Sequence, residues 1–410
     1  MREFDIVVFG ATSFVGRILC RYLLDTYGND GSRLRWAIAA RSAARLAELK
    51  HELDGAADGL PVIVADAADE TAMRSLAVRA KVVVSTVGPY ALYGEPLVKA
   101  CAETGTDYCD LTGEVQWIRR MIERYESAAK ASGARIVHCC GFDSIPSDFG
   151  VFFLQQEARR RLGRPASRIK MRVRAMRGGF SGGTAASLLN VAKEVRANPA
   201  LRKELANPYS LCVGVTGGAN VRQPNVSSAL YDADFKGFVA PFVMAAINTR
   251  IVHRSNALSG YAYTRDFRYE EAVSTGRGFQ GRLAAIGTAL GLGAFMFASV
   301  IGPTRALLER YVLPKAGEGP SPEAQRRGFF DLRFLGRIDD GQVIRAKVTG
   351  DRDPGYGSTA KMLGEAAVCL ALEVQKSERS GGFWTPSTMF GERLLSRLVS
   401  RAGLSFEIAD

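Results

Sequence analysis

Short apolar runs and longer amphipathic segments alternate along the first 140 residues of the chain. Apolar runs bounded by turn residues are typical of buried strands, and the amphipathic stretches between them are typical of helices. The pattern predicts strands at 4–9, 34–40, 61–65, 81–86 and 134–140, and helices at 15–27, 42–54, 69–78, 94–104 and 115–132. This alternation predicts an α/β fold with a Rossmann-type, doubly wound parallel sheet, which we expect to form a dinucleotide-binding domain over residues 1–145.

The pattern changes after Gly141 and predicts a mixed α+β substrate domain over residues 146–350. Gly178–Thr184 is rich in glycine and precedes a predicted helix, so it forms either an anion- or carbonyl-binding nest or a plain turn. Asp339-Asp340-Gly341 lies between two apolar runs and predicts a hairpin. The further expectations are helices at 147–162, 185–196 and 357–376, strands at 168–176, 329–337 and 343–349, and an irregular segment at 205–245.

The turn after the first apolar run carries a cofactor signal. Gly10 ends the run, Gly16 opens the next predicted helix, and Ser13 stands where a strict fingerprint has glycine. A strand, a tight turn and a helix N-terminus direct backbone N–H groups and the helix dipole at a phosphate. This context favours a dinucleotide site over a plain turn, and the residues expected to line the site are Gly10, Ala11, Thr12, Ser13, Phe14, Val15 and Gly16.

The end of the second predicted strand favours NADPH over NADH. An NAD site usually places an acid there to hold the ribose 2′-hydroxyl. Arg41 and Ser42 occupy that position instead, and a guanidinium group suits a 2′-phosphate. The alternative is that Arg41 only ends a strand in solvent.

The third and fourth strand ends complete the predicted cofactor site. Asp66 is placed to meet the adenine, and Thr86, Val87, Gly88 and Pro89 are expected near the nicotinamide ribose, because ligands lie beyond the carboxyl ends of such strands. Ordinary loop chemistry is the alternative for these residues. Tyr90 and Asp143 lie on the same side of the sheet and are the catalytic candidates. A tyrosine in such a place also serves as a pocket wall, and Asp143 is alternatively a cap on the helix that follows.

Composition narrows the class of protein. A chain of 410 residues is too long for one ordinary core, and its net charge of +12 suits an anionic substrate, a membrane surface or nucleic acid. Nucleic acid is not expected, because basic runs and RNA-binding aromatic motifs are missing from the sequence. Seven scattered cysteines and three separated histidines predict reduced thiols, no metal site and a cytoplasmic protein. A homodimer stays open.

Residues 283–301 are uncharged throughout. Arg277 and Arg282 precede this segment, and Arg305 and Arg310 follow it. As a helix the segment would reach roughly across a bilayer core of about 30 Å. Three interpretations stay open: a buried or domain-bridging helix, a membrane-surface or acyl-binding element at the inner face of the plasma membrane, and a membrane-spanning helix.

Several motifs together resemble the saccharopine dehydrogenase-like oxidoreductases, and within them the trans-acting enoyl reductases. The resemblance covers almost the whole chain. It is carried by FDIVVFGATSFVG (4–16), STVGPYALYGEPLVKACAETGTDYCDLTGE (85–114), GARIVHCCGFDSIPSDFG (133–150), GGFSGGTAASLL (178–189), NTRIVHRSNAL (248–258), DRDPGYGSTAKMLGEAA (351–367) and FWTPSTMFGERLLSRL (383–398).

The resemblance implies a Rossmann domain, a substrate domain, and C-terminal helices at 351–410 that return to pack on the first domain. It also implies NADPH-dependent reduction of a carbon–carbon double bond in a polyketide-derived lipid, such as a phthiocerol- or phenolphthiocerol-type lipid, with the enoyl substrate free or carrier-bound. Two other functions stay open: an amino-acid oxidoreductase like saccharopine dehydrogenase, and a non-catalytic, membrane-associated nucleotide-binding protein.

Overall fold

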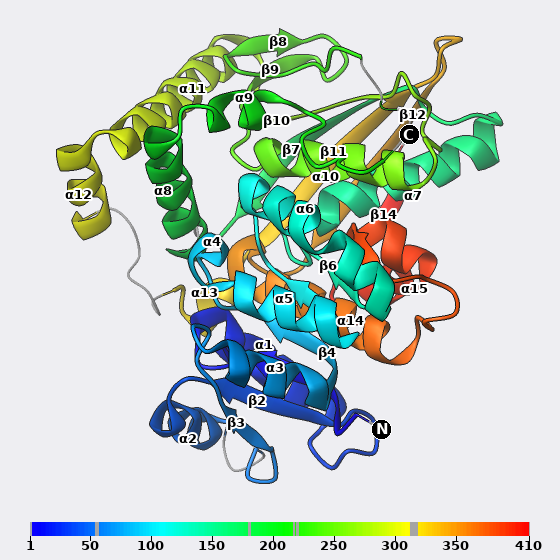
Figure 1. The fold of residues 1–410 in the computed structure, drawn as a ribbon. Helices are drawn as coiled ribbons and strands as arrows, with labels where there is room; N and C mark the ends of the chain where they lie inside the picture. Colours follow the sequence, from blue (N-terminus) through cyan, green and yellow to red (C-terminus); the bar gives the residue numbers. More distant parts are fainter. Residues whose placement is uncertain are drawn as a thin grey trace.

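Two seven-stranded sheets carry the fold (Figure 1). The computed structural model describes residues 2–53, 57–178, 182–215, 218, 221–311 and 319–409. The first sheet has the strand order β13-β6-β5-β4-β1-β2-β3, and every neighbouring pair in it is parallel. Its strands are β1 (Phe4–Phe9), β2 (Trp36–Ala40), β3 (Val62–Val64), β4 (Ala80–Ser85), β5 (Asp107–Asp110), β6 (Arg135–Val137) and β13 (Gly382–Trp384). The predicted doubly wound α/β fold is confirmed.

Helices cover both faces of this first sheet, so successive residues of its central strand enter two different cores. Ile6 and Val8 of β1 pack with one set of helices, and Val7 and Phe9 pack with the other. The first set contains α1 (Phe14–Tyr27), α2 (Ala43–Glu52) and the C-terminal α14 (Thr359–Leu372). The second set contains α3 (Glu70–Arg79), α5 (Glu95–Thr104) and α6 (Val115–Ser132), and the short α4 (Tyr90–Tyr93) precedes α5. A sheet buried on both faces explains the continuous apolar runs of its strands.

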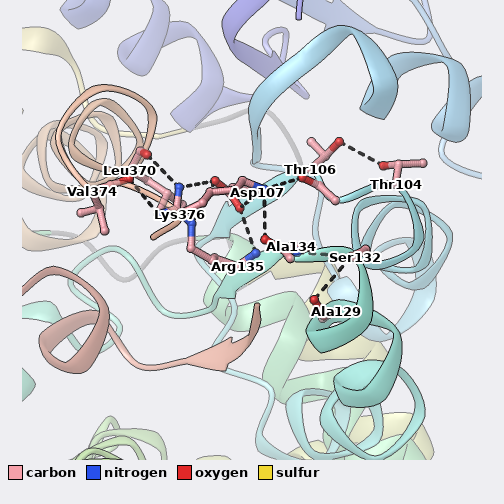
Figure 2. Close-up of polar contacts among 12 residues, drawn as sticks. Thr104, Thr106, Asp107, Ala129, Ser132, Ala134, Arg135, Leu370, Val374 and Lys376 are labelled. Atoms are coloured by element: carbon pink, nitrogen blue, oxygen red, sulfur yellow. Dashed lines mark hydrogen bonds and ion pairs between the residues drawn. The ribbon is translucent and has the colours of Figure 1, made fainter. Parts of the chain in front are cut away.

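The sequence did not predict strand β5, because the segment that forms it, DYCD, begins and ends with an acid. Asp107 is nevertheless buried, and it accepts hydrogen bonds from the backbone N–H of Arg135 at 2.9 Å and from its Nε at 3.1 Å. Lys376 lies 3.4 Å from the same carboxylate. Figure 2 shows this cluster, in which Arg135 also donates to the carbonyl of Val374 at 2.8 Å and thereby ties β6 to the C-terminal end of α14.

The second sheet is mixed and has the order β14-β12-β11-β7-β10-β9-β8. Its central pair β7–β10 is parallel and its other pairs are antiparallel. The predicted hairpin is confirmed, because the turn at Asp339-Asp340-Gly341 joins β11 to β12 and Gly341 has φ +92°. The strands are β7 (Arg168–Arg177), β8 (Leu230–Asp232), β9 (Gly237–Pro241), β10 (Arg268–Gly276), β11 (Phe329–Arg337), β12 (Val343–Gly350) and β14 (Leu404–Ala409).

Helix α7 (Ile145–Leu162) joins the two sheets and packs closely on the second one. A Cβ on Gly150 would lie 2.3 Å from the ring of Phe334, so only glycine allows this approach of α7 to β11. The apolar core is continuous from Leu19 in α1 through Phe149 to Phe334. The remaining elements are α8 (Gly182–Ala197), α9 (Leu201–Ala206), α10 (Ala245–Leu258), α11 (Gly278–Val300), α12 (Gly302–Tyr311), α13 (Pro322–Arg326), the π-helical turn η1 (Pro354–Ser358) and α15 (Pro386–Ser400).

Two expectations about the second half are corrected. Residues 205–245, expected to be irregular, contain the β8–β9 hairpin, whose turn residue Lys236 has φ +52°. The strands are short and β8 is an edge strand, so the sequence carries little period-two signal there. The C-terminal segment contains strands as well as helices, because β13 extends the first sheet and β14 extends the second.

Candidate active site

The turn after β1 needs glycine at both of its predicted positions. Gly10 has φ +87°, and a Cβ on it would lie 2.7 Å from both Thr86 Oγ1 and Val87 Cγ2. A Cβ on Gly16 would lie 2.2 Å from the carbonyl oxygen of Gly10. The first residue is therefore fixed by backbone conformation and the second by close helix–turn packing.

Ser13 fits the turn in place of the usual glycine. Its φ is −70°, a conformation open to any residue, and its hydroxyl caps α1 by accepting from the backbone N–H of Gly16 at 2.9 Å. The same hydroxyl lies 2.9 Å from Thr86 Oγ1, which donates to the carbonyl of Gly10 at 2.9 Å. The serine therefore links the turn to the end of β4.

The open end of α1 fits a dinucleotide phosphate. The first N–H groups of a helix have no partner inside the helix, and Ser13 satisfies only that of Gly16, which leaves those of Phe14 and Val15 for an anion. The first turn of α1 carries no acidic residue. Thr12 and Phe14 are half-buried beside this end, and Ala11 is buried beneath it. The ring of Phe14 lies edge-on against Tyr356, with 4.8 Å between centroids.

Arg41 and Asp66 follow the neighbouring strands β2 and β3. Arg41 is exposed and forms no ion pair with any residue that the structure describes. Ser42 caps α2, and its hydroxyl accepts from the backbone N–H of Arg45 at 3.3 Å. Asp66 is exposed and accepts from the backbone N–H of Ala68 at 3.0 Å. The guanidinium group of Arg41 is thus free to bind a 2′-phosphate.

The segment Thr86–Pro89 lies directly beside the glycine turn, at the point where strand order reverses between β1 and β4. The backbone N–H of Thr86 donates to the carbonyl of Phe9 at 3.0 Å, and the Gly88–Pro89 peptide bond is cis. Gly88 is exposed, and Thr86, Val87 and Pro89 are half-buried. Ligands of doubly wound sheets bind at such a reversal.

Tyr90 holds two strand ends together. Its buried hydroxyl donates to the carbonyl of Ser85 at 2.9 Å and accepts from the backbone N–H of Leu111 at 3.2 Å. Burial raises the pKa of Tyr90 well above its usual value. The one proton of this hydroxyl is committed to a backbone carbonyl, so we do not assign the proton transfer to Tyr90.

Glu114 is a site residue that sequence reasoning missed. Its carboxylate accepts from the backbone N–H groups of Tyr90 at 2.8 Å and Ala91 at 3.0 Å, and from the hydroxyl of Ser187 at 2.8 Å. Burial raises its pKa. Glu114 therefore joins the loop after Pro89 to α8. The sequence signal that could have identified Glu114 is its position as the last residue of the motif 85–114.

Asp143 lies beyond the end of β6, and apart from its own backbone N–H its carboxylate has no hydrogen-bond or ion-pair partner among the residues that the structure describes. A Cβ on Gly141 would lie 2.9 Å from Asp143 Oδ2, so glycine at this position makes room for the carboxylate, whereas a Cβ on Gly113 would be in ordinary contact with Oδ1 at 3.9 Å. Its environment raises the pKa of Asp143 to about 7, mainly through desolvation and additionally through the negative charge of Asp110. The helix cap is Ser144 and not Asp143, so the alternative role as a cap does not hold.

Asp110 and His138 support the loop that carries Asp143. Asp110 accepts from His138 Nδ1 at 2.7 Å and from the backbone N–H groups of Thr112 at 3.1 Å and Cys139 at 3.2 Å. Cys139 has φ +62°, a strained conformation for a residue with a side chain. Sequence reasoning missed this pair, because it joins an acid at the end of β5 to a histidine at the end of β6.

The C-terminal motif 351–367 also reaches the site. Asp353 accepts from the backbone N–H groups of Tyr356 at 3.0 Å and Gly357 at 2.9 Å, which fixes the η1 turn. The hydroxyl of Tyr356 accepts from the backbone N–H of Gly182 at 3.0 Å. Within the predicted glycine-rich nest, residues 179–181 lie outside the described residues. The motif thus connects the first turn of α1 to the start of α8.

Comparison with known proteins assigns the chain to a family. Residues 6–137 match the family model described as the saccharopine dehydrogenase NADP binding domain. The protein named trans-acting enoyl reductase from Mycobacterium tuberculosis (strain ATCC 25618 / H37Rv) is 37% identical over 411 residues, which cover 97% of this chain and 96% of that protein. The chain belongs to the trans-acting enoyl reductase family.

Two further relatives named as trans-acting enoyl reductases align with this chain over nearly the full length of both proteins. The one from Mycobacterium ulcerans (strain Agy99) is 37% identical over 97% of this chain and 96% of its own. Another from Mycobacterium tuberculosis, provisionally named as such a reductase, is 40% identical over 99% of this chain and 97% of its own. Among solved structures, saccharopine dehydrogenase from Saccharomyces cerevisiae aligns over 99% of each chain, with a TM-score of 0.49 and 12% identity.

This trans-acting enoyl reductase family member is an NAD(P)H-dependent oxidoreductase, and its cofactor is NADPH. The glycine turn and the end of α1 fit the pyrophosphate, and Arg41, which pairs with no described residue, fits the 2′-phosphate. Thr86, Val87 and Pro89, which we expect near the nicotinamide ribose, follow β4, and Asp143 follows β6, two strands away in the same sheet.

Proposed function

We propose that the enzyme reduces the carbon–carbon double bond of an α,β-unsaturated thioester, with Asp143 as the proton donor. The observation that carries the proposal is a carboxyl group at the strand ends of the cofactor site that forms no ion pair with any described residue and has a pKa of about 7. The names of the relatives and the NADP-binding domain support the reaction class.

The reaction joins two hydrogens to the double bond. When bound, NADPH supplies the hydride that adds to the β-carbon. The protonated carboxyl group of Asp143 gives its proton to the α-carbon, and the resulting carboxylate recovers a proton from water. A general acid works best when its pKa lies near the working pH, and a pKa of about 7 meets that condition.

The proposed substrate is a long polyketide-derived chain that another protein presents. The relatives' names describe reductases that act in trans, which supports a carrier-bound enoyl thioester. The motif resemblance supports a lipid of the phthiocerol or phenolphthiocerol type. The surroundings of Asp143 are apolar, since Ile247 lies beside Gly113 and Phe142 packs on Phe330 with 5.0 Å between ring centroids.

The test is NADPH oxidation by the purified enzyme with trans-2-enoyl thioesters of increasing chain length. The Asp143→Asn variant keeps the size of the side chain but has no acidic proton, so we expect its kcat to fall about 100-fold while NADPH still binds. Asp339→Asn, in the exposed hairpin turn, is the matched control. Stoichiometric NADPH binding without oxidation by any enoyl thioester would contradict the proposal and favour a non-catalytic nucleotide-binding protein.

A further inference from the structure

Helix α11 presents a stripe of large apolar side chains to solvent. Phe279 is 73% exposed, Leu290 is 68% exposed and Phe297 is 70% exposed. Leu283 and Ile286 are also exposed and lie between them. The spacings of four, three, four and seven residues place all five on one face of the helix. We call these five residues the α11 stripe; it is about 27 Å long at 1.5 Å per residue.

The opposite face of α11 is fixed to the second sheet through small residues. Gly281 and Ala285 are buried, and a Cβ on Gly281 would lie 2.4 Å from the carbonyl carbon of Gly276. The single hydroxyl proton of Thr275 is shared between the carbonyl of Gly281 at 2.9 Å and that of Phe238 in β9 at 3.1 Å. Figure 1 shows α11 along the outer side of the molecule, beside β9 and α8. Of the alternative of a buried or domain-bridging helix, the buried form is therefore wrong.

The segment Gly278–Ser299 is long and apolar enough to cross a membrane by length and composition, and little of it is buried. Its close packing on β9 and β10 holds it against the protein instead. A helix with one face fixed to the protein and a long apolar face in solvent is suited to lie in a membrane interface.

The charges around the stripe favour an anionic surface. Arg277 and Arg282 are exposed, and neither forms an ion pair with a described residue. The sequence contains no aspartate or glutamate between Glu271 and Glu309. Cations at the edge of an apolar face bind the phosphates of lipid headgroups while the apolar side chains enter the acyl region.

A second copy of the chain fits the α11 stripe less well than an anionic lipid surface does. A twofold interface must be self-complementary, and this face offers apolar groups beside the cationic Arg277 and Arg282. Protein interfaces also carry about one hydrogen bond per 100–200 Å², whereas the large exposed side chains of the α11 stripe offer no polar group.

We infer that the α11 stripe inserts into the headgroup and upper acyl region of an anionic lipid bilayer and holds the enzyme at its surface. Helix α8 connects this surface to the site, because it packs against α11 and its Ser187 donates to Glu114 at 2.8 Å. The membrane contact and the reduction are separable, because no residue of the stripe belongs to the site.

The experiment is flotation of the full-length protein with phosphatidylcholine vesicles, with and without phosphatidylglycerol. We expect binding that requires phosphatidylglycerol, and a loss of about tenfold or more in Leu290→Glu and in Phe297→Glu. Arg282→Gln should weaken binding to the anionic vesicles. The matched control is Val399→Glu on α15, a residue that is 50% exposed and lies outside the stripe. Unchanged NADPH binding shows that each variant is folded.

A second measurement reports insertion directly. The fluorescence of Leu290→Trp should shift to the blue on anionic vesicles and be quenched by lipids with brominated acyl chains, whereas Val399→Trp should show neither change. Failure of the wild type to float, equal binding to neutral vesicles, or wild-type binding by Leu290→Glu would each overturn the inference. So would a dimer, or a complex with an acidic carrier protein, that Leu290→Glu disrupts in the absence of vesicle binding.

Discussion

The hydroxyl of Ser13 lies 2.9 Å from the hydroxyl of Thr86, across the turn that receives the cofactor. Thr86 also donates to the carbonyl of Gly10, so one threonine at the end of β4 fixes both the glycine and the serine of the turn. The shape of the phosphate cradle therefore depends on two neighbouring strands and not on the glycine motif alone.

Thr86→Val should loosen this cradle. Valine keeps the shape of threonine but removes both hydrogen bonds, which are worth about 1 kcal/mol each. We expect the dissociation constant of NADPH to rise by up to about 30-fold, measured by nicotinamide fluorescence. Thr288→Val, which removes an exposed hydroxyl on α11, should leave it unchanged. Unaltered NADPH affinity in Thr86→Val would show that the cradle does not depend on this link.

Arg41→Ala should weaken the binding of NADPH and leave the binding of NADH unchanged. A hydrogen bond to a charged group is worth about 1.5–3 kcal/mol, so NADPH binding should weaken by roughly 10- to 100-fold. NADH has no 2′-phosphate, and its binding should not change. Arg74→Ala, which removes an exposed pair with Glu103 on α3, is the control. Equal losses for both cofactors would remove Arg41 from the 2′-phosphate site.

Asp143 should impose a pH dependence on activity. Its pKa of about 7 means that the protonated, active form is lost as the pH rises through neutrality. The kcat with an enoyl thioester should therefore fall above about pH 7 in the wild type. In Asp143→Asn the residual kcat should not follow this titration. A wild-type profile that stays flat through this range would contradict the role of Asp143.

The same carboxyl group should affect stability with a definite sign. The folded pKa of about 7 exceeds the ordinary value of 3.8, so between these values the folded state holds a proton that the unfolded state has lost. The contribution of Asp143 to the free energy of unfolding should thus decrease as the pH rises from about 4 to about 7. Asp143→Asn should remove this contribution, measured by urea unfolding at several pH values.

Arg135→Met should destabilise the protein strongly. The buried guanidinium group neutralises Asp107 and also donates to the carbonyls of Leu370 and Val374. Removing one partner of a buried ion pair costs about 3–5 kcal/mol, because the other charge stays buried. Urea unfolding followed by tryptophan fluorescence measures the loss. Arg74→Met, in an exposed pair, should cost less than about 1 kcal/mol.

The sequence predicted the elements that carry enough apolar or turn-forming residues of their own to identify them. The strand Phe4–Phe9 is apolar except for Asp5, and the helix after it carries its apolar residues on the buried face. The hairpin turn at Gly341 has the residues that its geometry needs. Strand β5 could not be predicted, because its two aspartates are buried only with partners far along the chain. Asp107 needs Arg135 and Lys376, and Asp110 needs His138.

In the candidate site too, the residues set by local sequence were predicted and those that depend on distant partners were missed. Gly10, Gly16 and Thr86 lie where the strand ends predicted them, because parallel strands bring their carboxyl ends to one edge. Glu114 and Tyr356 were missed, because their roles depend on contacts with α8, which belongs to the second half of the chain. Tyr90 and Asp143 were both candidates in the sequence, and their hydrogen-bond partners distinguish them.

The most direct test of the account follows the two hydrogens into the product. The enzyme is supplied with NADPH deuterated at the transferable C4 position and a trans-2-enoyl thioester in ordinary water, and the product is analysed by mass spectrometry and NMR. The account predicts one deuterium, at the β-carbon, and a solvent hydrogen at the α-carbon, with this product formed about 100-fold more slowly by Asp143→Asn. A product without deuterium, deuterium at the α-carbon, or an undiminished rate in Asp143→Asn would contradict it.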